Sequence, residues 1–256
     1  MKKLNVIALA FAACGMSFST FAAVGSDQSQ PFDPSGSSVQ VGATEGTAGY
    51  YGGAIGDPGI GVQAVYGGKT ISFSGLTKMA PKQAGNEAHV ISMPNTPGNP
   101  ATHNKMGVFN FAQVANAEIY FGEWSSTGKV NDTTHTAYYS GKDVTSNMPT
   151  AGTAEYSVKG ISQYNGGALA TGTLTANFGS KSLAGNIGST NIDAKIKNNA
   201  TFAGDATLNG AVGEARGHFF GDQAKHIAGV TKFNDQSKDI LWWEPRRYLP
   251  VTCKSI

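Results

Sequence analysis

Five histidines, His89, His103, His135, His218 and His226, are the side chains of this 256-residue sequence best suited to chemistry. Imidazole is a common ligand for transition metals, iron included. His218 and His226 lie at strand-like runs of the C-terminal half, where we interpret them as ordinary strand or turn residues. The other three lie in loops or at strand starts of the N-terminal half, among Pro, Gly, Asn and Thr. We therefore expect any metal-ligating site in that half.

Signatures of catalysis are missing from the sequence. It has no Walker loop, dinucleotide fingerprint, paired-histidine zinc spacing or nucleophile elbow. The Gly-rich stretch 52–61 is neither preceded by a predicted strand nor followed by a predicted helix, and the carboxylates are scattered. No acid–base pair for glycoside chemistry stands out. We expect a binding protein and not an enzyme.

Residues 1–22 have the layout of a secretory signal peptide. A basic start precedes an apolar run, and small residues flank a predicted cleavage point after Ala22 or Ala23. The stretch ending at Cys14 also resembles a lipobox, in which the cysteine would be lipidated, but the apolar run continues past it to the second site. We favour a freely secreted, extracellular protein over a lipid-anchored one at the cell surface.

Composition limits the fold and the partners. The chain has 34 Gly and only 14% charged residues, which is a poor composition for helices and a rich one for turns. Its formal charge of +2 falls to zero once Lys2 and Lys3 leave with the signal peptide, so there is no electrostatic case for nucleic acid. Only Cys253 then remains, which excludes an internal disulfide.

The N-terminal half predicts irregular β-structure. Residues 24–60 have no strong period and predict turns or an irregular arm, whereas alternating apolar positions in Gly61–Phe73 predict a strand. Four prolines between residues 80 and 105 exclude a helix or a central strand and predict a long loop. Strand-like stretches at Met106–Val114 and Ala117–Trp124 follow.

The C-terminal half predicts a barrel. Short β-runs are joined by turn dipeptides such as Gly179-Ser180, and apolar Ile192, Ala194 and Ile196 alternate with polar residues along one of them. Consecutive antiparallel strands of this kind predict a filled up-and-down barrel of eight strands. The runs are His135–Ser140, Thr153–Ile161, Gly172–Phe178, Ser182–Ile187, Asn191–Ile196, Thr201–Leu208, Glu214–Phe220 and Ile227–Phe233.

Two patches, Phe121-Gly122-Glu123-Trp124 and Asn147-Met148-Pro149-Thr150, are the most specific of several that resemble the hemophilin family. These are secreted or surface haem-binding proteins of Gram-negative bacteria, and the resemblance covers most of residues 60–235. It implies an all-β protein with a clamp-like haem-binding domain, here residues 23–148, and an eight-stranded barrel used for export recognition, here residues 149–256.

The resemblance also implies a cofactor and partners. The cofactor is haem b, the exporter is the surface lipoprotein assembly modulator, and the recipient of the haem is a TonB-dependent outer-membrane receptor. Haemoglobin is a candidate source of the haem. The competing interpretation is a surface adhesin or host-protein binder on the same exported barrel, which a haem titration would distinguish.

Among the histidines of the haem-binding half, His103 is the first candidate for an iron ligand, because it ends the Pro-rich loop beside a predicted strand. His135 is the second candidate and His89 the third. Two of them would give six-coordinate iron, and one alone would leave an open face. Aromatic walls of a haem cleft are available at Tyr50, Tyr51, Phe109 and Tyr138.

The end of the chain departs from the family. Where members close the barrel with a small-residue Phe-Gly-Gly type strand, this sequence has Trp242 and Trp243 followed by prolines. Pro245 and Pro250 limit any closing strand to Asp239–Glu244. We interpret residues 240–256 as an atypical or altered tail.

Overall fold

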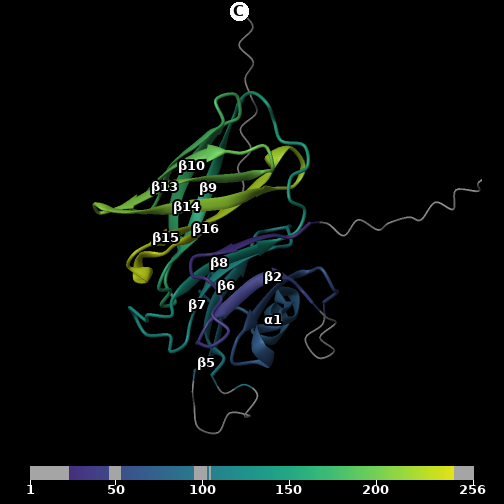
Figure 1. Cartoon of the computed structure of the whole chain (residues 1–256), viewed down its shortest axis with the longest axis vertical. Helices are drawn as coiled ribbons and strands as arrows, with labels where there is room; N and C mark the ends of the chain where they lie inside the picture. Colours follow the sequence, from purple (N-terminus) through teal and green to yellow (C-terminus); the bar gives the residue numbers. More distant parts are fainter. Residues whose placement is uncertain (1–22, 46–52, 95–102, 104, 245–256) are drawn as a thin grey trace, which may run out of the picture.

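The computed structural model describes residues 23–45, 53–94, 103 and 105–244. Within them, three layers stack on one another (Figure 1): an eight-stranded barrel, a five-stranded sheet, and a small sheet with one helix. The predicted signal peptide, Tyr50, Tyr51 and the tail after Glu244 lie outside the described residues. No helix in the described part of the chain is long and apolar enough to span a membrane.

The N-terminal half contains two antiparallel sheets, of order β1-β8-β7-β6-β5 and β2-β3-β4. Its elements are β1 (Gly25–Gln28), β2 (Val39–Ala43), β3 (Pro58–Val62), the 3-10 turn η1 (Tyr66–Gly68), β4 (Ile71–Ser72), α1 (Phe73–Met79), β5 (His89–Met93), β6 (Gly107–Gln113), β7 (Ile119–Ser125) and β8 (Thr136–Gly141).

The C-terminal half is a closed antiparallel barrel in which β16 pairs with both β15 and β9. Its elements are β9 (Thr153–Ile161), β10 (Ala170–Asn177), β11 (Ser182–Ile187), β12 (Thr190–Ile196), β13 (Thr201–Leu208), β14 (Ala211–Phe220), η2 (Asp222–Ala224), β15 (His226–Phe233), η3 (Gln236–Lys238) and β16 (Leu241–Trp243). The all-β architecture with an eight-stranded barrel is as the sequence predicts.

Strand alternation fills the barrel. Ile192, Ala194 and Ile196 are buried along β12 while the residues between them are exposed, because successive side chains of a strand point to opposite faces. Small residues let neighbouring strands approach: a Cβ atom at Gly204 of β13 would collide with the backbone of Asp193 on β12. The interior is therefore packed with side chains and is not a ligand cup.

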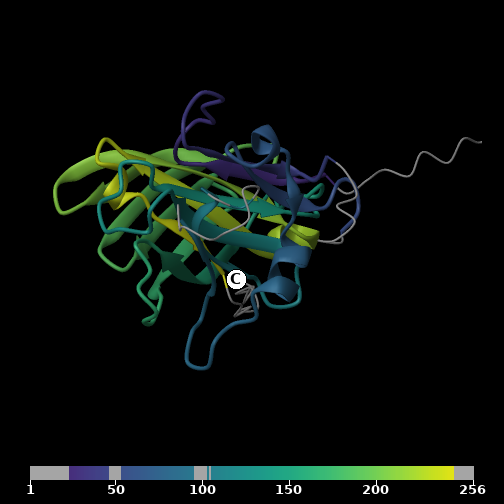
Figure 2. The ribbon, with the colours of Figure 1, turned by 90° about the horizontal axis from the view of Figure 1, so that it is seen from below.

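The five-stranded sheet has a different core on each face, so its central strands β7 and β8 are buried on both sides. One face packs Phe109, Trp124 and Tyr138 against α1 and the small sheet. The opposite face packs Phe121 and other residues against the barrel. β1, in the purple segment of Figure 2, runs between β8 of the teal sheet and β14 of the barrel.

Four sequence-based expectations are corrected. Residues 24–60 hold β1, β2 and the start of β3, because β1 takes its hydrogen bonds from the distant β8 and local periodicity cannot show that. Residues 61–73 hold the end of β3, η1 and β4 in place of one long strand. The Pro-rich stretch contains β5, because the strand fits between Pro81 and Pro94 and includes no proline itself. The run His135–Ser140 is β8 of the N-terminal sheet and is not a barrel strand.

The eighth barrel strand is supplied by the tail that the sequence marked as atypical. Trp242 points into the barrel, where its ring stacks on Phe202. Its neighbour Trp243 points the other way and stacks on Phe121 of the five-stranded sheet. The two tryptophans therefore close the barrel and attach it to the N-terminal half.

Candidate functional site

The loop of the β5–β6 hairpin carries His103. The strands that support it are registered with Met93 opposite Gly107 and His89 opposite Phe111. The side chain of His103 is half-buried, and its carbonyl oxygen accepts a hydrogen bond from the amide of Met106 at 3.4 Å. His103 thus lies four residues before β6, which is paired with β5.

His89 lies at the other end of the same hairpin, as the first residue of β5. Its Nδ1 is 2.6 Å from the carbonyl oxygen of Ala80 and its ring stacks on Phe111. A carbonyl only accepts, so Nδ1 carries a proton, and burial lowers the pKa of this histidine so that the neutral ring is favoured. The unprotonated nitrogen is therefore Nε2, and an unprotonated ring nitrogen is what a histidine uses to bind a metal. The ring is 8% exposed.

His135 is placed quite differently, between the five-stranded sheet and the barrel. Its Nε2 is 2.8 Å from Oε2 of Glu123, and its Nδ1 is 2.9 Å from the carbonyl oxygen of Gln236. With both nitrogens occupied and the ring 5% exposed, this histidine holds two segments of the protein together. In this arrangement it has no nitrogen to offer to iron.

The two described aromatic candidates are core residues. Phe109 and Tyr138 are 2% and 0% exposed, between the five-stranded sheet and the small sheet. The hydroxyl of Tyr138 has no hydrogen-bond partner among the described residues, and burial raises its pKa well above the usual value. They support the hairpin from behind and do not line an open surface.

Exposed apolar side chains lie on the other face of the hairpin, the face that also carries Asn110 and is turned toward the barrel. Val90 on β5 is 38% exposed, and Val130 in the β7–β8 loop is 71% exposed. Half-buried Val108 on β6 shares the face of Val90, and its side chain lies beside Gly128 of the β7–β8 loop. These valines were not among the site residues predicted from the sequence, although the alternation of β6 places Val108 on the face opposite the buried Phe109.

No group of three His, Cys, Asp or Glu side chains within the described ranges could hold a metal ion.

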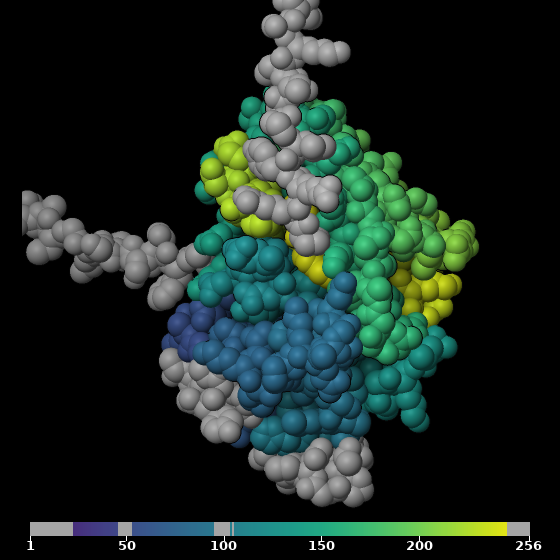
Figure 3. Space-filling view, turned by 180° about the vertical axis from the view of Figure 1, so that it is seen from behind, coloured from purple at the N-terminus to yellow at the C-terminus, as the bar shows by residue number. Residues whose placement is uncertain are grey.

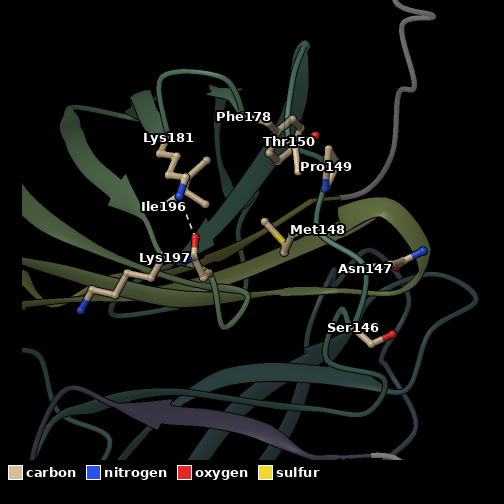
Figure 4. A pocket seen from close by; sticks show the side chains of 10 residues that line it. Ser146, Asn147, Met148, Pro149, Thr150, Phe178, Lys181, Ile196 and Lys197 are labelled. Atoms are coloured by element: carbon tan, nitrogen blue, oxygen red, sulfur yellow. Dashed lines mark hydrogen bonds between the residues drawn. The ribbon is translucent and has the colours of Figure 1, made fainter.

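The barrel end has a cavity of about 320 Å³, bounded by the linker Ser146–Thr150 and two barrel turns. Figure 4 shows Met148 directed into it and Lys181 bonded to Asn198. Its lining contains no histidine or carboxylate, and it belongs to the barrel and not to the hairpin. Asn147 fastens the linker by donating to Asp222 at 2.5 Å.

His218 and His226 belong to barrel strands β14 and β15, as expected. His218 Nδ1 is 2.7 Å from the hydroxyl of Tyr139, across the contact between the barrel and the N-terminal sheet.

A layered sheet domain with a histidine-bearing hairpin, fixed to a filled barrel, defines a two-domain binding protein. A model of the HphA N-terminal heme-binding domain matches residues 20–136, and one of the HphA C-terminal domain matches residues 146–242. The chain belongs to the HphA (hemophilin) family, whose members are binding proteins and not enzymes, and its N-terminal part is a haem-binding domain of that family.

Relatives extend this result to the fold. HpuA of Kingella denitrificans, described as a haemoglobin receptor, is 18% identical with a TM-score of 0.55 in its apo form, covering 93% of this chain and 91% of that one. The structure of HpuA from the same organism in complex with human haemoglobin is 19% identical with a TM-score of 0.56, and the match covers 93% of this chain and 92% of that one. At these identities the likeness shows the fold alone.

A sequence relative is an uncharacterized protein of Haemophilus influenzae (strain Rd), 29% identical over 152 residues. The alignment covers 52% of this chain and 52% of the relative, so the chain spans about half the length of that protein.

Proposed function

We propose that this protein is a secreted hemophore that binds haem b at the β5–β6 hairpin, with His103 as the iron ligand. The observation that carries the proposal is the haem-binding domain at residues 20–136, which includes the hairpin. Of the three candidate histidines, His103 alone lies on the hairpin loop and is half-buried, while His89 and His135 are buried.

The surface beside the hairpin suits a porphyrin. Haem is flat and mostly apolar, and sites for such molecules combine apolar walls with a few polar groups. Val90 and Val108 offer apolar surface on one face of β5 and β6, Val130 is exposed in the β7–β8 loop, and His103 would supply the nitrogen. Bound haem supplies an iron that takes an imidazole as axial ligand.

Strand register favours a single protein ligand. His89 and Met93 stand at opposite ends of β5, about 13 Å apart at the usual rise per residue. His103 follows the Met93 end. His103 and His89 therefore lie at opposite ends of the hairpin, and one of them alone would hold the haem in this arrangement. We expect five-coordinate iron with an open face.

Delivery follows from where the ligand lies. A histidine on a hairpin loop can move by local opening, which costs less than unfolding the barrel. The protein can thus hold haem and still yield it to a TonB-dependent outer-membrane receptor. Export by the surface lipoprotein assembly modulator, through recognition of the barrel, belongs to the same proposal.

The test is a haem titration of the mature protein followed by Soret absorbance. Replacing His103 with alanine should shift or flatten the Soret band and speed haem loss to apomyoglobin by at least about tenfold, since even partners of a metal ligand change affinity about 10–100-fold. Lys105→Gln is the matched control, because Lys105 is exposed in the same loop and should leave both readouts unchanged. An unaltered spectrum in His103→Ala would refute His103 as the ligand.

A second function, capture of haemoglobin, is favoured by the match to HpuA over 93% of this chain. The relative was solved with human haemoglobin, and the present protein could draw haem from the same carrier. Size-exclusion chromatography with haemoglobin separates the two functions: a hemophore takes up haem without a stable complex, whereas a carrier binder co-elutes with haemoglobin.

A further inference from the structure

Glu123 is the centre of a buried polar junction between the two domains. Its carboxylate is 3% exposed and accepts four hydrogen bonds. Two come from the N-terminal domain, from His135 Nε2 at 2.8 Å and Asn110 Nδ2 at 2.8 Å. Two come from the barrel, from the amides of Gln163 at 2.5 Å and Tyr164 at 2.6 Å.

The hydrogen-bond inventory fixes the protons at this junction. Glu123 receives two amide protons and one side-chain amide proton, so both of its oxygens act as acceptors, as in an ionised carboxylate. His135 faces two groups that can only accept, this carboxylate and the carbonyl oxygen of Gln236. A neutral imidazole carries one N–H and can satisfy only one of them.

We infer that His135 is an imidazolium in the folded protein and acts as a proton-dependent lock between the N-terminal domain and the barrel. It connects β8 to η3 of the barrel, while its partner Glu123 connects β7 to the β9–β10 loop. Loss of the proton removes either the bond to Glu123 or the bond to Gln236. This role goes beyond haem binding and requires no haem.

The surroundings of His135 support a cation. Glu123 faces it from β7, and Asp239 acts on it from the segment between η3 and β16. Burial works against the charge, but the bonds to Glu123 and Gln236 outweigh it and raise the pKa of His135. Asp239 is itself fully buried, and burial raises its pKa although Phe233 and Gln30 donate to it.

The direction of the pH dependence follows from linkage. Because the folded pKa of His135 lies above 6.5, its contribution is complete below pH 6.5 and is lost as the pH rises through the raised value. The pKa of Glu123 is lowered below 4.5, so its contribution is complete above pH 4.5 and is lost on acidification through the lowered value. The lock is therefore tightest at mildly acidic pH.

The first test is nitrogen NMR of the histidine rings in the haem-free mature protein at pH 6.5, which separates a raised pKa from a lowered one. We expect both ring nitrogens of His135 to be protonated. His218 is the internal control, because burial lowers its pKa and its ring should be neutral. A neutral His135 at this pH would overturn the inference without bearing on haem binding.

The second test is hydrogen exchange of the Gln163 and Tyr164 amides. His135→Gln should lower their protection factors by roughly tenfold or more, since hydrogen bonds to charged groups are the strong ones. The wild-type protection should approach that of the variant as the pH is raised from 6 to 9. His218→Gln should leave these two amides as they are. Equal protection in the wild type and His135→Gln at pH 6 would refute the lock.

Discussion

Replacing Trp242 with alanine tests whether the unusual tail is a true barrel strand. The side chain is 0% exposed and its ring lies 5.4 Å from that of Phe202, between centroids. Truncating a buried Trp costs about 3–5 kcal/mol. For a protein of this size, each kcal/mol shifts the melting temperature by roughly 2–4 °C. We therefore expect a fall of about 6–20 °C by circular dichroism.

Trp242→Phe sharpens the test. The indole N–H of Trp242 is buried and has no acceptor among the described residues, and such a group costs about 1–3 kcal/mol. Phenylalanine keeps a ring against Phe202 and removes that N–H. The melting temperature of Trp242→Phe should therefore fall much less than that of Trp242→Ala.

Val212→Ala is the control for both variants, because Val212 is 69% exposed on the same barrel and should change stability by less than about 0.5 kcal/mol. If the melting temperature of Trp242→Ala equals that of the wild type, Trp242 of β16 does not help to close the barrel.

Two further substitutions probe other parts of the fold. Gly204→Ala should lower the free energy of unfolding, measured in urea, by about 1–3 kcal/mol, because its Cβ would meet the backbone of Asp193. Gly42→Ala is the control and should leave this free energy unchanged, because the space around its Cβ is open. His89 has a lowered pKa, so its neutral form contributes stability that is lost as the pH falls below 6.5. His89→Gln should reduce the acid destabilisation measured by urea unfolding between pH 7 and pH 5, and an unchanged pH profile would contradict the assignment.

The barrel could be predicted from sequence because its information is local. Each strand pairs with its neighbour in the chain from β9 to β16. Alternation such as that of Ile192, Ala194 and Ile196 therefore predicts the strands, and their order in the barrel is their order in the sequence. The closing strand was the exception, because two tryptophans facing opposite sides show no alternation of apolar and polar residues.

The N-terminal half could not be predicted to the same degree, because its pairings are distant. β1 pairs with β8 more than a hundred residues away, and both faces of β7 are buried, which erases the period-two pattern. Glu123 illustrates the limit. The sequence marked its patch as specific to the family, but only the structure shows donors from β6, β8 and the barrel meeting at one carboxylate.

The five-stranded sheet is supported unequally along its width. Seen from behind (Figure 3), residues 53–94 form one surface beneath the barrel, with the hairpin at the far side of the five-stranded sheet from β1. β5 is an edge strand held on one side only, by β6, whereas β7 and β8 are fixed to the barrel through Phe121, Glu123 and His135. The N-terminal sheet is therefore anchored to the barrel at β7 and β8 and has its least supported strand at the β5 edge.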